Sequence, residues 1–265
     1  MILSKIAEMP PSVLLIFAVN IILVSWFILF RIFVFPKREW TEETKRRPRS
    51  FVSNAAFREW WYVVIGPFKK KLVDWNVNPN TITTWGFCLS ILAGAAFSIG
   101  EFGIGGWLVI LGATCDIYDG QLARLREIKL KSGAFYDSVL DRVGEVAIFY
   151  GIAKYFRADD TLFLIIFLGF AASQVVSYSR ARAEGLGYGH LGARGFFQRA
   201  ERMICLSIGM PFAPMFEHFW GLGDWLVKFT VVFICIGSIQ TALSRMTGTF
   251  IGIKKDEKEK GLINK

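Results

Sequence analysis

Four aspartates, gathered in one short stretch of an apolar chain, are the side chains best suited to chemistry. Asp116 and Asp119 are three residues apart and Asp137 and Asp141 are four apart, so each pair lies on one face of a helix. A helical hairpin that turns near residues 127–132 sets Asp119 opposite Asp137 and Asp116 opposite Asp141. All four carboxylates then meet at one level, roughly 13 Å from the turn by helical rise.

Carboxylates that converge in this way repel one another and cannot all stay ionised without cations. An all-oxygen cluster suits hard divalent ions such as Mg²⁺ or Mn²⁺. Two such ions would balance the four charges, and paired metal ions about 4 Å apart serve displacement at phosphorus. The alternative is that the aspartates form structural ion pairs with Arg124, Arg126 and Arg142. We favour the metal site, because ionisable groups inside membrane segments are usually functional.

The elements that must position these aspartates are predicted to lie in a membrane. The chain of 265 residues is 53% hydrophobic, and apolar stretches long enough to cross a bilayer recur along it. The first, residues 13–35, spans roughly 34 Å as a helix. A basic run follows it in place of a cleavage site, so we interpret it as a retained transmembrane helix rather than a signal peptide.

Six further crossings are expected after a helix that lies in the headgroup layer. That interfacial helix is indicated by residues 57–75, where adjacent tryptophans are followed by three lysines. The expected fold class is an all-α integral membrane protein, in which a six-helix transmembrane catalytic core follows the interfacial helix and one extra N-terminal transmembrane helix. The expected core spans are residues 81–100, 104–126, 132–156, 162–184, 195–216 and 225–250.

These elements divide the chain into four predicted parts. They are an N-terminal transmembrane helix (1–36), a basic cytoplasmic segment with the interfacial helix (37–78), the six-helix domain (79–250) and a charged cytoplasmic tail (251–265). The net charge is +9, and the basic residues concentrate in connections that fall on one side of the predicted spans. The positive-inside rule therefore puts the aspartates and the C-terminus on the cytoplasmic side of the cell membrane and the N-terminus outside. Because these basic residues are divided among several connections between apolar spans, they argue against nucleic-acid binding.

The aspartate stretch resembles the signature of the CDP-alcohol phosphotransferases, also called phosphatidyltransferases, which is D-x2-D-G-x2-A-R-x8-G-x3-D-x3-D. The resemblance covers the six-helix core and the interfacial helix, and the first span is an addition to the minimal family pattern. It implies a Mg²⁺- or Mn²⁺-dependent transfer of a substituted phosphate from a CDP-linked donor, usually CDP-diacylglycerol, to an alcohol with release of CMP. A homodimer among membrane lipids is also implied. Every fixed position is present: Asp116, Asp119, Gly120, Ala123, Arg124, Gly133, Asp137 and Asp141.

The same resemblance implies a role for each motif residue. Asp116, Asp119 and Asp137 would hold two divalent cations, and Asp141 would complete the cluster and act as the base on the incoming hydroxyl. The CDP nucleotide would be bound by the set Asp119, Gly120, Ala123, Arg124 and Gly133.

A second stretch, residues 177–203, concentrates arginines on the predicted cytoplasmic side, and the planar fork of arginine suits phosphate. It resembles phosphatidylinositol-phosphate synthases through a Y-x-[KR]-A-R-A-E element at residues 178–184 and an R-x-E-R element at residues 199–202. The resemblance implies inositol phosphate as the acceptor. Glycerol 3-phosphate as acceptor, a soluble CDP-inositol donor, and an ordinary basic loop remain alternatives. The arginines expected to bind the acceptor phosphate are Arg180, Arg182, Arg199 and Arg202.

A different functional class also fits the composition, namely a carrier whose intramembrane carboxylates bind a transported cation. A transport site would lie near the middle of the membrane and use interrupted helices. The aspartates here belong to one hairpin near the cytoplasmic boundary, which favours the enzyme.

Overall fold

The described part of the chain is helical, with no β-strand. The computed structural model describes residues 8–46, 54–127, 130–192, 195 and 197–262. In chain order the elements are α2 (Pro11–Leu29), a π-helical turn η1 (Phe30–Val34), a 3-10 turn η2 (Phe35–Lys37), α3 (Glu42–Arg46), α4 (Ala55–Asp74), α5 (Pro79–Ser98), α6 (Phe102–Leu125), α7 (Lys131–Tyr155), α8 (Asp160–Gly185), α9 (Gly189–Gly192), α10 (Arg199–Trp220) and α11 (Gly223–Glu259).

Helices occur at every range predicted for the core, but they differ in how apolar they are. Among the described residues, four helical segments are long and apolar enough to cross a membrane, namely α2 with its two extending turns, α5, α8 and α11. The helices α6 and α7 carry the aspartates, which lowers their apolar content. Membrane crossing by α6, α7 and α10 therefore stays a prediction.

Several helix ends differ from the predicted spans, among them the start of α10 and the end of α11. α10 begins at Arg199 rather than at residue 195, because Gln198 and Glu201 form a capping box in which the Gln198 N–H donates to Glu201 Oε2 at 3.0 Å. α11 continues to Glu259, so most of the predicted charged tail is helical. Ion pairs four residues apart, such as Lys255–Glu259 at 3.8 Å, support this extension.

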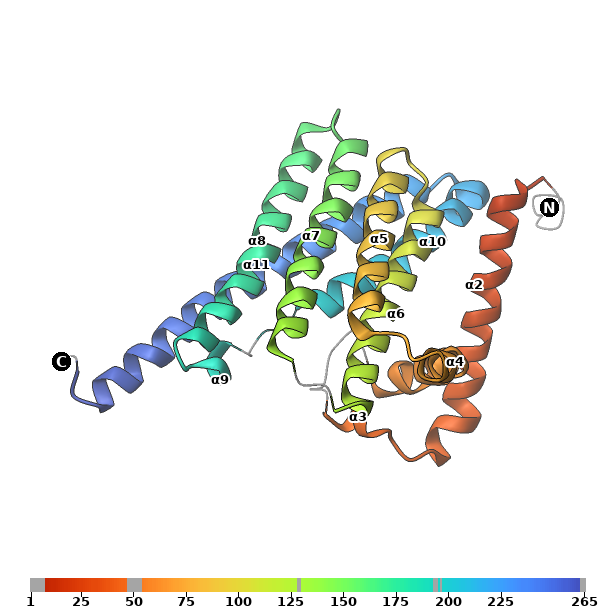
Figure 1. Cartoon of the computed structure of the whole chain (residues 1–265). Coiled ribbons are helices and arrows are strands. Elements are labelled where there is room, and N and C mark those ends of the chain that lie inside the picture. The colour runs from red at the N-terminus through yellow and green to blue at the C-terminus, as the bar shows by residue number, and fades with distance from the viewer. Residues whose placement is uncertain (1–7, 47–53, 128–129, 193–194, 196, 263–265) are drawn as a thin grey trace.

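The bundle is built around close contacts of α5 with α6 and α7, while α10 packs against α6 and α11, and α11 against α8 (Figure 1). Gly94 of α5 and Gly151 of α7 face each other with no room for a side chain at either position. Small residues of this kind let membrane helices approach closely. The hairpin of α6 and α7 is thereby held against one shared helix. Residues 128–129 of its predicted turn lie outside the described residues.

The N-terminal part is joined to the bundle by α4, which is seen end-on in Figure 1 and so runs across the bundle axis. Glu59 of α4 is fully buried and accepts hydrogen bonds from Arg38 Nε at 3.1 Å and from the Thr41 backbone N–H at 2.8 Å. These contacts fix the connection between α2 and α4.

Candidate active site

The hairpin brings three of the four predicted aspartates to one point. Single carboxylate oxygens of Asp116, Asp119 and Asp137 all lie within 4.8 Å of one another. Opposite ligand oxygens around a Mg²⁺ ion are roughly 4.2 Å apart, twice the usual Mg–O distance. The spacing and the all-oxygen donor set therefore fit a small divalent cation. This convergence is what the three- and four-residue spacings predict for an antiparallel hairpin.

Asp141 and Asp116 share a partner on a third helix. Arg199, at the first position of α10, forms an ion pair through Nη2 with Asp141 Oδ1 at 2.8 Å and through Nη1 with Asp116 Oδ2. Among the described residues, Arg124, Arg126 and Arg142 make no ion pair with any of the four aspartates. The alternative that named those three arginines as structural partners is therefore not supported.

Sequence reasoning missed Thr83, which orients one of the aspartates. Its hydroxyl donates to Asp119 Oδ2 at 2.7 Å, and both residues are buried. α5 begins at Pro79 after Asn78, which caps the helix by accepting from the Asn80 N–H. The first turns of α5 then carry polar residues toward α6. An available signal was the group of threonines, Thr81, Thr83 and Thr84, in the first turns of this predicted helix.

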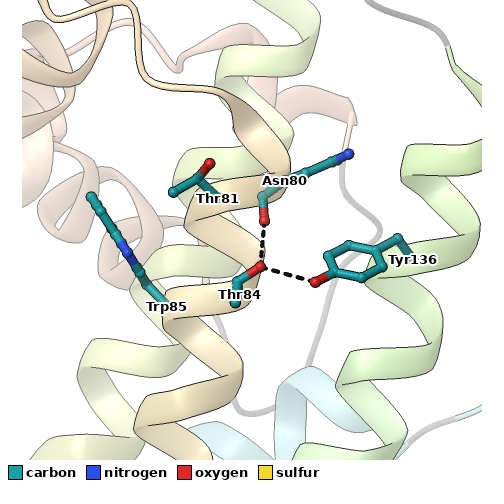
Figure 2. A pocket seen from close by; sticks show the side chains of 5 residues that line it. All are labelled: Asn80, Thr81, Thr84, Trp85 and Tyr136. Carbon is teal, nitrogen blue, oxygen red and sulfur yellow. Dashed lines mark hydrogen bonds between the residues drawn. The ribbon is translucent and has the colours of Figure 1, made fainter.

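A small polar pocket of about 280 Å³ lies beside the hairpin, between α5 and α7 (Figure 2). The Thr84 hydroxyl donates to the Asn80 carbonyl oxygen at 2.9 Å and lies 3.0 Å from the Tyr136 hydroxyl. Tyr136 precedes Asp137 in the chain, and Gly133 passes so close to Asn80 that a Cβ there would meet its Oδ1 at 3.3 Å. The pocket therefore adjoins the predicted nucleotide residue Gly133, and its wall includes Tyr136, the chain neighbour of Asp137. Asn80, Thr81, Thr84, Trp85 and Tyr136 line it.

The other residues predicted to bind nucleotide lie along α6. Gly120 is covered by the guanidinium of Arg124, whose Nη1 would be 3.3 Å from a Cβ at that glycine. Ala123 is half-buried on the same helix, and Arg124 is exposed. Their contact with a nucleotide remains a prediction.

The four arginines predicted to bind an acceptor fall into two groups. Arg180 and Arg182 are exposed near the end of α8, where Arg180 Nε pairs with Glu184 Oε1 at 2.9 Å. Arg199 and Arg202 belong to the first turn of α10. Arg199 therefore stands among the aspartates, whereas Arg180 already has a partner on its own helix.

Arg202 forms a second ion pair, one helical turn deeper than Arg199. Its Nε and Nη2 donate to the two carboxylate oxygens of Glu145 at 2.6 and 3.2 Å, and both side chains are fully buried. Arg142 Nη1 lies 3.9 Å from the same carboxylate. Sequence reasoning missed Glu145, although it lies four residues after Asp141 on the same helix face. The predicted contact of Arg202 with an acceptor phosphate stays a prediction.

The chain is similar to proteins of known family. Residues 76–240 match the CDP-alcohol phosphatidyltransferase family. A phosphatidylinositol phosphate synthase of Streptomyces avermitilis is 32% identical over 200 residues, which cover 73% of this chain and 80% of that protein. An archaetidylinositol phosphate synthase of Pyrococcus horikoshii is 38% identical over 145 residues, covering 54% of this chain and 74% of that protein.

The chain is also similar to solved structures of a phosphatidylinositol phosphate synthase. The Mycobacterium tuberculosis phosphatidylinositol phosphate synthase with CDP-DAG bound superposes with a TM-score of 0.61 and 26% identity, covering 69% of this chain and 92% of that one. The same enzyme in complex with manganese and citrate gives a TM-score of 0.62 and covers 69% of this chain and 88% of that one.

Proposed function

The chain belongs to the CDP-alcohol phosphatidyltransferase family, and from that membership we propose that it transfers a phosphatidyl group from CDP-diacylglycerol to inositol phosphate. The observation that carries the proposal is the convergence of Asp116, Asp119 and Asp137, with Asp141 beside them on Arg199. The acceptor is supported by the names of the relatives and by the two arginine-rich elements.

In the proposed reaction, a hydroxyl oxygen of the acceptor attacks the phosphorus that bears the diacylglycerol. A new phosphodiester bond forms, the bond from this phosphorus to the CMP oxygen breaks, and CMP departs with the bonding electrons. Asp141 accepts the proton of the attacking hydroxyl, which a carboxylate within hydrogen-bond reach can do. Arg199, placed between Asp141 and Asp116, would hold the acceptor phosphate close to that base.

Asp116, Asp119 and Asp137 would hold the divalent cations, two in our proposal, which supply positive charge opposite the diphosphate and the departing CMP. Thr83 keeps Asp119 in one orientation through its hydrogen bond. Gly120, which the Arg124 guanidinium covers, and Gly133, which lies beside Asn80, would contact the nucleotide together with Asp119.

The proposal also includes the setting of the enzyme. The distribution of basic residues supports an active site and C-terminus on the cytoplasmic side and an N-terminus outside. The family resemblance supports a homodimer, which crosslinking in membranes would test.

The reaction is tested by measuring CMP release from CDP-diacylglycerol by the purified protein with Mg²⁺ or Mn²⁺. Inositol 1-phosphate, glycerol 3-phosphate, inositol and serine are compared as acceptors, with Asp141→Asn as the control. We expect release with inositol 1-phosphate and its loss in the variant. Release with glycerol 3-phosphate instead would replace the acceptor, and release only from CDP-inositol would replace the donor.

A further inference from the structure

A second cavity, of about 330 Å³, lies apart from the polar pocket, between α2 and the bundle. Leu23, Val24 and Phe27 of α2 form its outer wall. Its inner wall comes from α6 and α10, where Ile110, Ile117 and Ile208 are among the lining residues, and α4 closes one end with Trp60, Trp61 and Arg58. The cavity is thus apolar along its length and carries a cation at the end made by the interfacial helix.

α2 touches the bundle on both sides of this cavity. Asn20, the buried residue of α2, donates through Nδ2 to the Pro211 carbonyl oxygen of α10 at 3.0 Å. Toward the N-terminal end, the Phe17 ring lies 6.0 Å from that of Phe219. Toward the other end, the Phe27 ring lies 5.3 Å from that of Trp60. Side-chain hydrogen bonds between membrane helices hold them in register, so α2 is fixed at a distance that leaves the cavity between.

The occupant that suits this cavity is a hydrocarbon chain. Its volume of about 330 Å³ falls in the range of small-molecule sites, and it is a partly open cleft rather than a sealed void. An apolar cavity does not hold water well and binds apolar ligands instead. Because α2 and its neighbours are predicted to lie in a bilayer, lipid acyl chains are the apolar ligand at hand.

The position of the inner wall indicates which lipid supplies the chain. Ala113 and Ile117 of α6 line the cavity and flank Asp116, so its wall comes within about one helical turn of the aspartates. A donor whose diphosphate is bound there must direct its diacylglycerol into the bilayer nearby. This step rests on the proposed function.

We propose that α2 closes a lateral groove of the bundle into a cavity that takes one acyl chain of the CDP-linked donor and selects its length. α2 lies outside the residues matched by the family, 76–240, so this selection is a property added to the common core. Without α2 the same groove would face lipid and accept chains of any length.

The test compares two leucines of α2. Leu23 lines the cavity, while Leu29 is 55% exposed on the lipid-facing side. The kcat/KM for CDP-dioleoylglycerol is divided by that for CDP-didecanoylglycerol, in the full chain with inositol 1-phosphate. Leu23→Trp fills the cavity and should lower this ratio roughly tenfold, a typical effect of overpacking. Leu29→Trp should leave it unchanged.

Leu23→Ala enlarges the cavity and should raise the ratio by about threefold, with Leu29→Ala as its control, which provides a second test if the tryptophan variant does not fold. Equal ratios in the Leu23 and Leu29 variants would overturn the proposal while wild-type CMP release still supported the proposed function. Native mass spectrometry then measures whether a phospholipid co-purifies with each variant. Loss of a co-purified phospholipid in Leu23→Trp with an unchanged ratio would show a structural lipid, which would also overturn the proposal.

Discussion

Two layers of charge join α7 to α10, one helical turn apart. In the outer layer Arg199 pairs with Asp141 and Asp116, whose side chains are 15% and 26% exposed. In the inner layer Arg202 pairs with Glu145, and both side chains have no exposure. Both layers pair an arginine with carboxylates, so we attribute the difference in their functions to solvent access and to the balance of charges.

The comparison shows what separates a ligand site from a structural pair. The inner carboxylate receives two hydrogen bonds from one guanidinium and is sealed from solvent. In the outer layer Arg199 pairs with two aspartates, and Asp119 and Asp137 lie close to Asp116, which leaves an excess of carboxylates for cations. We infer that the outer layer binds substrates and metal ions, and that the inner layer holds α7 and α10 at the separation that the outer layer needs.

The largest expected effect is the loss of CMP release when Asp141, the proposed base, is replaced. Asp141→Asn should reduce the rate of CMP release by roughly 10²–10⁴-fold, because general-base catalysis contributes that much. Thermal stability in detergent should not fall, since the change removes a negative charge from a repelling cluster. Activity within a fewfold of wild type would place the base elsewhere.

The inner layer should respond in stability rather than in chemistry. Arg202→Met removes both hydrogen bonds to the buried Glu145 carboxylate and leaves only Arg142 Nη1, 3.9 Å away. This should lower the free energy of unfolding by about 3 kcal/mol, the lower end of the cost of breaking a buried ion pair. The double variant Glu145→Leu, Arg202→Met removes both charges and should recover most of that loss.

The same double variant tests the predicted acceptor contact of Arg202. If the inner layer is structural, the KM for inositol 1-phosphate should stay near the wild-type value once stability is restored. A large rise in this KM, with the fold intact, would show that Arg202 contacts the acceptor. The inner layer would then not be purely structural.

Arg199→Lys should raise the KM for the acceptor about tenfold, because lysine cannot reproduce a fork that contacts two groups at once. Arg180→Lys tests the other predicted acceptor element, in which Arg180 is exposed and pairs with Glu184 on its own helix. We expect less than about a twofold change there, in line with the small energies of exposed pairs. Equal increases in the two variants would assign both arginines to the acceptor.

Thr83→Val removes the hydroxyl that orients Asp119 and keeps the side-chain shape. Groups that orient metal ligands typically contribute 10–100-fold to metal affinity or activity, and we expect the lower end of about tenfold for Mn²⁺ affinity. Thr84→Val is the control, because Thr84 is the next residue of α5 and its hydroxyl donates to the Asn80 carbonyl oxygen, not to Asp119. Electron paramagnetic resonance of free Mn²⁺ measures the binding directly, and equal affinities would remove Thr83 from the site.

The smallest expected effect concerns Glu59, a carboxylate outside the two layers. Burial acts to raise the pKa of Glu59, but hydrogen bonds from Thr44, Thr41 and Arg38 outweigh it and hold the pKa below its ordinary value. The stabilisation is therefore complete above the pKa of an unfolded glutamate, about 4.3, and is lost as the pH falls through the lower folded pKa. Melting temperatures of wild type and Glu59→Gln, measured from neutral to acidic pH, should converge at low pH. A constant difference would contradict this assignment.

Much of the fold and part of the site follow from local sequence patterns. The spacing of the aspartates predicts a hairpin that turns near residues 127–132, and in the structure α6 ends at Leu125 and α7 begins at Lys131. The apolar runs predict the helices of the core. Helix ends were less predictable, since the start of α10 depends on a capping box and the extension of α11 on charged pairs within the tail.

The sequence by itself determined the helices, the hairpin and the convergence of Asp116, Asp119 and Asp137, because helical periodicity and a short turn leave little freedom between residues so close in the chain. Only the tertiary structure decided the partners from distant helices. These are Thr83 on Asp119, Arg199 on Asp141, and Arg202 on Glu145. The same holds for the cavity under α2, which depends on the separation of helices whose packing no local pattern specifies.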